Sequence, residues 1–378
     1  MQKNLKKNPL PRLRVVVLGT GGTIAGTADN TEDVLGYTAG QIGVAQLLQG
    51  LPGLTRVQAD LQVDLQTEQL AQVDSKDMDF ALWKRLAERT HSALLRADVT
   101  AVVITHGTDT LEETAYFLHC VMPGDLLARK PVVLTCAMRP ASSTQPDGPQ
   151  NLLEAVLTAL QPQARGVLVV CAGQIHSALE VQKVHSHQLD AFASGPGGPV
   201  GHFDRQATPH PRARHANSSP PDKANAAATL APLPQPQWLQ TPPIAATDAG
   251  LMPLIGLCDV LPRVELVVNH VGAGPWLVDV LLAAGAASLA AVPPATAGPP
   301  VLRGLVVAGT GNGSVHGALE AALLRAQGAG VRVVRASRCT WGGVQAVAGQ
   351  AIAEVSSLSA VKTRIALQLE LLANKMTE

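Results

Sequence analysis

Short apolar runs bounded by glycine alternate along this chain with segments of helical period, and this alternation limits the possible folds more than any other feature. The clearest unit lies between residues 100 and 138. Residues 100–105 form one apolar run, a segment with apolar positions at helical spacing follows, and residues 131–137 form the next run. This order is typical of two parallel strands joined by a crossover helix in a sheet that is covered on both faces.

The start of this crossover helix carries a spacing typical of a helix N-terminus. Thr110 is followed three residues later by Glu113, as in a capping box, so we expect the helix to begin directly after the HGTDT segment. That segment then lies at the carboxyl end of a strand, where open α/β sheets bind their ligands.

The length of 378 residues favours two domains. We predict an α/β protein with a larger, mostly parallel sheet and flanking helices in residues 1–205, and a smaller C-terminal α/β domain in residues 251–378. Residues 206–250 are rich in proline, alanine and small polar residues and predict a linker or insertion that builds no core. Further strands are expected at 166–171, 265–269, 302–308 and 331–336, and further helices at 276–286, 315–327 and a C-terminal docking helix around 361–372.

Charge and cysteine content narrow the possible partners and location. The chain has 29 basic and 29 acidic residues, so nothing indicates binding to nucleic acid or to an anionic membrane. Five scattered cysteines are typical of a reducing compartment. The apolar run at 15–18 is too short for a signal peptide, and no run is long enough to span a membrane. We therefore expect a cytoplasmic protein that acts on a small polar molecule.

The first chemically dense segment is VVVLGTGGTIAGT at residues 15–27. Its glycines and hydroxyls follow an apolar run, which is compatible with an ordinary turn or with a phosphate-binding loop. The spacing does not match GxGxxG, however, and no P-loop lysine follows. The residues alone leave these alternatives open.

Two further segments carry polar groups next to apolar strands. Thr108 and Asp109 lie side by side after the strand at 100–105, where they could cap the next helix or act in a site. Lys130 precedes a nearly uncharged strand, where a buried ammonium group needs a partner, and Asp109 is the available carboxylate.

Together these segments resemble the bacterial L-asparaginase and glutaminase-asparaginase family. The matching motifs, in the same order, are TGGTIAG at 20–26, THGTDTLEETAYFL at 105–118, KPVVLTCAMRP at 130–140 and DGPQNL at 147–152. The resemblance covers 13–205 well and 255–345 more loosely. It implies hydrolysis of the side-chain amide of L-asparagine to aspartate and ammonia, without a cofactor or metal.

The resemblance also implies catalytic roles. Thr23 matches the nucleophile, and Tyr37 lies on a lid segment and hydrogen-bonds it. Lys130 would act as base through Thr108 and be held by Asp109, because a threonine hydroxyl needs activation. Whether Thr23 or Thr108 attacks first stays open at this point. Main-chain N–H groups beside both threonines would stabilise the oxyanion.

Substrate binding follows from the same comparison of motifs. Ser75 would bind the α-carboxylate of the substrate, although it could also be a helix N-cap, and Asp109 would pair with the α-ammonium group. Lys76 replaces a glutamine that is common in the family. It should either point away from the substrate or change the substrate preference.

In the C-terminal part, segments 306–319 and 334–345 resemble those that complete the site of a neighbouring subunit. Asn312 and Ser314 are the candidates, in a homotetramer built as a dimer of dimers. The acidic residue that many relatives contribute after this point is not evident, and we do not assign Glu354 to that role.

Other functions remain as alternatives. They are a glutaminase-asparaginase of broader specificity, an amidase for a larger amide, and a non-catalytic module that binds a small molecule through the glycine–threonine loops. His176, His185 and His187 are interpreted as surface or hydrogen-bonded residues rather than metal ligands, because no other ligands cluster with them.

Overall fold

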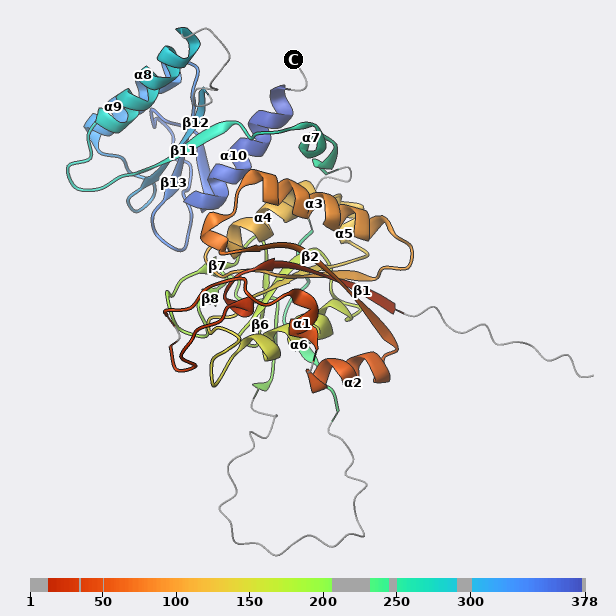
Figure 1. The fold of residues 1–378 in the computed structure, drawn as a ribbon. Coiled ribbons are helices and arrows are strands. Elements are labelled where there is room, and N and C mark those ends of the chain that lie inside the picture. Colours follow the sequence, from red (N-terminus) through yellow and green to blue (C-terminus); the bar gives the residue numbers. More distant parts are fainter. Residues whose placement is uncertain are drawn as a thin grey trace, which may run out of the picture.

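A computed structural model describes residues 13–33, 35–49, 51–205, 232–244, 250–290 and 301–375. These residues form two α/β units stacked through the C-terminal helix (Figure 1). The predicted fold class, a large mostly parallel sheet with a smaller α/β domain, is confirmed. Among the described helices, none is long and apolar enough to cross a membrane.

The large sheet has the strand order β10-β9-β6-β5-β4-β3-β1-β2. Strands β1, β2, β3, β4 and β5 are adjacent and parallel, and β6, β9 and β10 extend the sheet with antiparallel pairs. The strands are β1 (Leu13–Gly21), β2 (Val63–Val73), β3 (Ala101–Thr105), β4 (Val132–Thr135), β5 (Val167–Cys171), β6 (Gln174–Ser177), β9 (Gly201–Phe203) and β10 (Pro236–Trp238).

Helices cover both faces of this sheet (Figure 1). The first layer consists of α3 (Phe80–Leu95), α4 (Leu111–Val121) and α5 (Gly124–Leu127), and the second of α1 (Val44–Leu48), α2 (Pro52–Asp60) and α6 (Gly148–Ala159). Strand β1 shows why its sequence is continuously apolar. Val16 and Leu18 pack in the first layer, whereas Val15 and Val17 pack in the second.

The smaller unit is a parallel sheet with the strand order β11-β12-β13-β14. Helices α8 and α9 pack on one face, and α10 packs between the other face and α4 of the larger unit. The elements are α7 (Met252–Leu257), β11 (Arg263–Val268), α8 (Trp276–Ala290), β12 (Leu302–Gly309), α9 (Gly317–Gly328), β13 (Arg332–Ser337), β14 (Val355–Ser359) and α10 (Ala360–Lys375).

The strands and helices predicted from apolar runs are confirmed, and so is the docking helix. Ile365, Leu369 and Leu372 of α10 lie in the same core cluster as α3 and α4. The helix start after HGTDT is also correct, since α4 begins at Leu111. The expected capping box is not formed, because Thr110 makes no side-chain cap bond and donates instead to the main chain of another loop.

The segment 206–250 departs in part from the prediction. Residues 206–231 and 245–249 lie outside the described residues. Within the segment, however, β10 pairs with β9 at the edge of the large sheet, and Leu233 and Trp238 pack against its core. Strand β10 has three residues and one aromatic side chain, which is too short a pattern to predict a strand in a proline-rich sequence. The division near 205 and 251 remains our proposal for the domain boundaries.

Candidate active site

The glycine–threonine segment at the end of β1 is tied to the carboxyl ends of the neighbouring parallel strands β3 and β2. Thr20 donates from Oγ1 to the carbonyl of Thr105 at 2.9 Å, and the N–H of Gly22 donates to the carbonyl of Val73 at 2.8 Å. These contacts place Thr23 in a short 3-10 turn, η1 (Thr23–Ala25), with only 5% of its surface exposed. The loop thus presents a buried hydroxyl at the end of the sheet.

Thr23 has the partner that the sequence predicted. Its Oγ1 lies 2.6 Å from the hydroxyl oxygen of Tyr37. The loop that carries Tyr37 is fixed by a two-way main-chain bridge between Thr27 and Thr38. A phenol at this distance can give or take the proton of the threonine hydroxyl.

Ser75 connects the end of β2 to the HGTDT loop. It begins η2 (Ser75–Asp77), is 2% exposed, and accepts on Oγ from the N–H of Asp109 at 3.1 Å. Thr110 donates from Oγ1 to the carbonyl of Ser75 at 2.7 Å. The alternative role of Ser75 as a helix N-cap is not observed, since Asp74 caps η2. The structure therefore brings Ser75 and Asp109 together.

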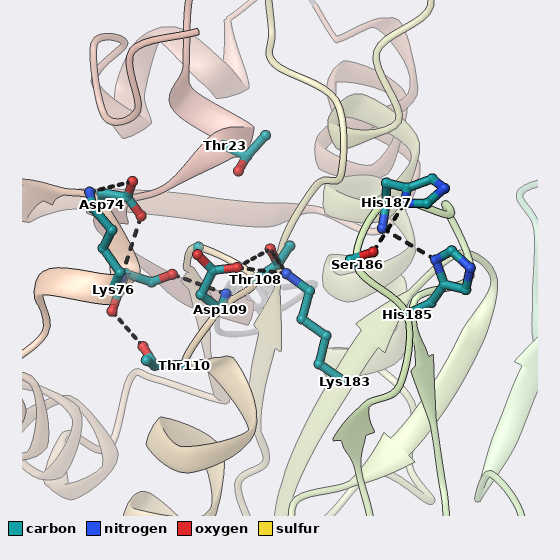
Figure 2. A network of polar contacts seen from close by, with 12 residues as sticks. Thr23, Asp74, Lys76, Thr108, Asp109, Thr110, Lys183, His185, Ser186 and His187 are labelled. Carbon is teal, nitrogen blue, oxygen red and sulfur yellow. Dashed lines mark hydrogen bonds and ion pairs between the residues drawn. The ribbon is translucent and has the colours of Figure 1, made fainter. Parts of the chain in front are cut away.

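The lysine at the centre of the site is Lys183, which the sequence analysis missed. Its Nζ donates to Thr108 Oγ1 at 2.9 Å and to Asp109 Oδ1 at 2.6 Å (Figure 2). The Lys183 side chain is only 16% exposed. Thr108 and Asp109 interact directly only over 3.5 Å, so the lysine is the group that joins them.

Lys183 lies in a two-residue strand, β7 (Gln182–Lys183), which pairs with β8 (Phe192–Ala193). Such a short strand gives no readable periodicity. One signal was available, because Lys183 is the only lysine between residues 131 and 222.

The predicted pairing of Lys130 with Thr108 and Asp109 is wrong. Lys130 Nζ donates to the carbonyls of Leu94 and Arg96, at 2.8 and 2.6 Å. These carbonyls lie at the C-terminus of α3, where main-chain acceptors lack helical partners and a cation is favourable. Burial and the neighbouring Arg129 lower the pKa of Lys130. The sequence correctly indicated that the Lys130 ammonium group needs partners, but these partners are main-chain carbonyls.

A second group missed by the sequence analysis is a buried chain behind the HGTDT loop. Trp83 Nε1 donates to Thr114 Oγ1 at 2.9 Å, and Thr114 Oγ1 lies 3.0 Å from His106 Nε2. His106 Nδ1 lies 2.7 Å from the Gly107 carbonyl, which can only accept, so we assign the ring proton to Nδ1. Burial lowers the pKa of His106 to about 4, which agrees with a neutral ring. This chain holds the main chain next to Thr108.

Lys76 points away from the site. Its Nζ binds Asp74 at 2.8 Å and Asp77 at 3.1 Å, and 61% of its side chain is exposed. Hydrogen bonds to the two aspartates raise the pKa of Lys76. The side chain runs toward Asp74 and away from Asp109 (Figure 2).

Asn312 and Ser314 lie in the smaller unit, in the loop between β12 and α9. The Asn312 amide makes two hydrogen bonds with the main chain of Gln345, and Ser314 pairs with Thr310 through its main chain. Glu354 forms an ion pair with Arg332. Among the described residues of this chain, neither Asn312 nor Ser314 hydrogen-bonds to Thr23, so their predicted role depends on a neighbouring subunit.

The three histidines after β5 take part in local hydrogen bonds. His176 Nδ1 lies 2.8 Å from Ser194 Oγ, and His185 Nδ1 accepts from the main chain of His187 and Gln188. Figure 2 shows His185 and His187 on the hairpin beyond Lys183.

Comparison with known proteins finds matches over most of the chain. The N-terminal asparaginase domain model matches residues 14–214, and the C-terminal glutaminase/asparaginase domain model matches residues 263–378. L-asparaginase 2 of Bacillus subtilis is 32% identical over 377 residues, covering 97% of this chain and 84% of that protein. An enzyme of Haemophilus influenzae named as a probable periplasmic L-asparaginase is 29% identical over 333 residues, covering 87% of this chain and 78% of that protein.

A solved structure shows the same fold. The crystal structure of a probable cytoplasmic L-asparaginase from Campylobacter jejuni is 31% identical, with a TM-score of 0.75, and the match covers 95% of this chain and 94% of the other. The fold and these matches thus define a hydrolase built from two α/β units. The chain belongs to the asparaginase family.

Proposed function

We propose that this protein is an L-asparaginase that hydrolyses the side-chain amide of asparagine to give aspartate and ammonia. The observation that carries the proposal is the position of Lys183, whose Nζ contacts both Thr108 and Asp109 in the loop that is tied to the Thr23 loop. A buried hydroxyl with a phenol partner beside a second hydroxyl with an amine partner suits acyl transfer from an amide.

In this proposal Thr23 attacks the carbonyl carbon of the side-chain amide, and its hydroxyl proton passes to the phenol oxygen of Tyr37, 2.6 Å away, as the phenol gives up its own proton. That proton goes to the leaving nitrogen, which departs as ammonia and leaves an ester on Thr23. Water then attacks this ester, gives a proton back to the Thr23 oxygen and releases aspartate. Thr108, with Lys183 at 2.9 Å, is placed to exchange protons during these steps. Lys183 replaces Lys130 in the relay that we expected from the sequence.

The α-groups of the substrate are assigned to two neighbouring residues. Ser75 would donate to the α-carboxylate, and Asp109, whose side chain is 51% exposed, would pair with the α-ammonium group. The hydrogen bond from the Asp109 N–H to Ser75 Oγ fixes the distance between these two contacts. Holding both ends of a zwitterion orients the amide toward Thr23.

A phosphate-binding role for the glycine-rich loop is less well supported. The N–H of Gly22 is already engaged by the carbonyl of Val73, and the N–H groups of Ala25 and Gly26 are bound to carbonyls within the same turn. A phosphate cradle requires such N–H groups to point at the ligand.

We propose a cytoplasmic homotetramer, organised as a dimer of dimers, in which Asn312 and Ser314 complete the site of a neighbouring subunit. The cytoplasmic location is supported by the Campylobacter jejuni structure, whereas the Haemophilus influenzae relative carries a periplasmic name. The subunit role is supported by the position of both residues in the smaller unit. Light scattering at micromolar concentration should give a tetramer, and a fully active monomer would contradict the role of Asn312 and Ser314.

The decisive experiment measures ammonia release from asparagine, glutamine and larger amides under the same conditions. We expect asparagine to give the highest kcat/KM. Comparable rates with glutamine would support the broader glutaminase-asparaginase, whose name is part of the matching C-terminal family model. Nucleotide binding by calorimetry without ammonia release would contradict an amidohydrolase altogether.

A further inference from the structure

Lys362 of α10 is a lysine buried at the junction of the two units. It is 1% exposed, and its Nζ donates to the carbonyls of Ala178, Leu179 and Val181 at 3.0, 2.9 and 2.6 Å. An ammonium group has three N–H donors, and here each has an acceptor. Complete pairing offsets the cost of burying the charge and fixes the geometry of the acceptors.

The acceptor carbonyls belong to the turn that leads into Lys183. Val181 is two residues before it and directly precedes the two-residue strand β7, which contains Lys183. Main-chain bonds from the N–H groups of Glu180 and Val181 to the Ser177 carbonyl shape the turn, and Lys362 holds it from the side of the smaller unit. The main-chain position of Lys183 therefore depends on Lys362, which lies 179 positions later in the sequence.

Glu112 of α4 supplies an opposite charge for the buried ammonium group of Lys362. Burial raises the pKa of Glu112, and the positive charge of Lys362 opposes this shift. The ammonium group of Lys362 also lies 5.9 Å from the ring centroid of Tyr116, on the same helix as Glu112.

We propose that Lys362 is a positioning residue for Lys183: it clamps the main chain of 178–181 so that the Lys183 amine reaches Thr108 and Asp109. This inference rests on the catalytic role proposed for Lys183. Lys362 is assigned no contact with substrate. The C-terminal helix would thereby support the active site of its own chain, in addition to its packing role.

The test compares two lysines that are both bound to main-chain carbonyls. Lys362→Met keeps most of the stem but removes the ammonium group, and Lys130→Met makes the same change at the end of α3, away from Lys183. For folded protein, verified by circular dichroism, we expect Lys362→Met to lower kcat about tenfold or more with a much smaller change in KM. Lys130→Met should keep kcat within about twofold of wild type.

A second variant keeps hydrogen-bond donors at the same position. Lys362→Gln retains two N–H donors in place of three and should lower kcat about threefold, less than Lys362→Met. A merely structural role would change the melting temperature in both variants and would leave the kcat of the folded fraction unchanged. Lys362→Gln decides the question if Lys362→Met does not fold.

Lys183→Met separates this inference from the proposed function. If Lys183→Met is inactive while Lys362→Met turns over normally, the clamp is wrong and the catalytic role of Lys183 stands. If folded Lys183→Met retains normal turnover, the catalytic role is wrong, and the clamp fails with it.

Discussion

Gly22 and Gly107, from two different strand-to-helix loops, pack main chain against main chain at the active site. A Cβ atom built on Gly22 would lie 2.3 Å from both the Cα and N atoms of Gly107, closer than real Cβ atoms come. Gly22 also has a φ of 79°, a main-chain angle that residues with a side chain rarely adopt. The close approach of the Thr23 and Thr108 loops therefore depends on the absence of side chains at both positions.

The first prediction concerns Gly107→Ala. Its Cβ would lie 2.5 Å from Ser75 Oγ, so Ser75 must move, and we expect KM for asparagine to rise about tenfold or more. Gly317→Ala is a matched control at the start of α9, where an added Cβ meets nothing within 4 Å. It should behave as wild type in steady-state kinetics. An unchanged KM in folded Gly107→Ala would contradict the substrate role of Ser75.

The second prediction identifies the nucleophile. Thr23→Ala should fold and bind substrate but lose roughly 10³-fold or more in kcat, because it removes the atom that forms the new bond. Thr27→Ala is the control, since its main-chain bridge to Thr38 does not need the side chain. Mass spectrometry of acid-quenched Thr108→Ala with asparagine should find the acyl group on the peptide that contains Thr23. An adduct at Thr108 in the Thr23→Ala variant would reverse the two roles.

The third prediction separates Lys183 from Lys130, the lysine that was expected in the relay from the sequence. Lys183→Met should leave folded protein almost inactive, because Thr108 and Asp109 lose the amine that joins them. Lys130→Met should remain active and lose about 1 kcal/mol in free energy of unfolding, since its role is at the C-terminus of α3. Ammonia release and urea unfolding measure the two effects. An inactive but folded Lys130→Met would restore Lys130 to the relay.

The fourth prediction addresses Lys76. Because its ammonium group is bound by Asp74 and Asp77 on the exposed side, Lys76→Gln should change the ratio of kcat/KM for asparagine over glutamine by less than about threefold. The measurement is ammonia release from both amides with variant and wild type. A large change in this ratio would mean that Lys76 turns toward the substrate when it binds.

The fifth prediction is a pH dependence of stability. Burial lowers the pKa of His106, His119 and His176 to about 4, from an ordinary value of 6.5. Between these values the unfolded chain binds more protons than the folded one, so the stabilisation is complete above about pH 6.5 and is lost as the pH falls toward 4. Each histidine contributes a slope of up to about 1.4 kcal/mol per pH unit in this window.

Urea unfolding at about pH 7 and about pH 5 tests this slope. His176 lies outside the Thr23 loop, so His176→Gln is a suitable variant. Its free energy of unfolding should depend less steeply on pH, by about one proton, even if the variant is less stable overall. An equal slope in the variant and wild type would mean that His176 titrates normally in the folded protein.

The sequence predicted the strands well because those of the parallel sheet are buried on both faces and read as continuous apolar runs, as β1 and β3 show. The contacts of Thr23 with Tyr37 and of Ser75 with Asp109 could be expected because these residues lie in or near recognisable motifs, in loops at one end of the sheet. The relation between a lysine and its partners follows no such local rule.

Lys130 and Lys183 show why. Both needed acceptors, but Lys130 found them at a helix end formed 34 residues earlier, whereas Lys183 reaches across from a two-residue strand that no pattern marks. Lys362 was hidden for a related reason. Its helix was predicted from the apolar face alone, and a single lysine among charged neighbours looks like an exposed residue until the packing is known.

The β9–β10 pair has a consequence for protein engineering. Phe203 and Pro236 face each other across this ladder, so the connection between them leaves and re-enters the sheet at one point of its edge, opposite to the edge formed by β2. Opening the chain in that connection and joining the natural ends elsewhere would give a circular permutant with new termini far from the Thr23 loop. Such a permutant offers a place to attach a carrier or a reporter while the catalytic loops keep their covalent order.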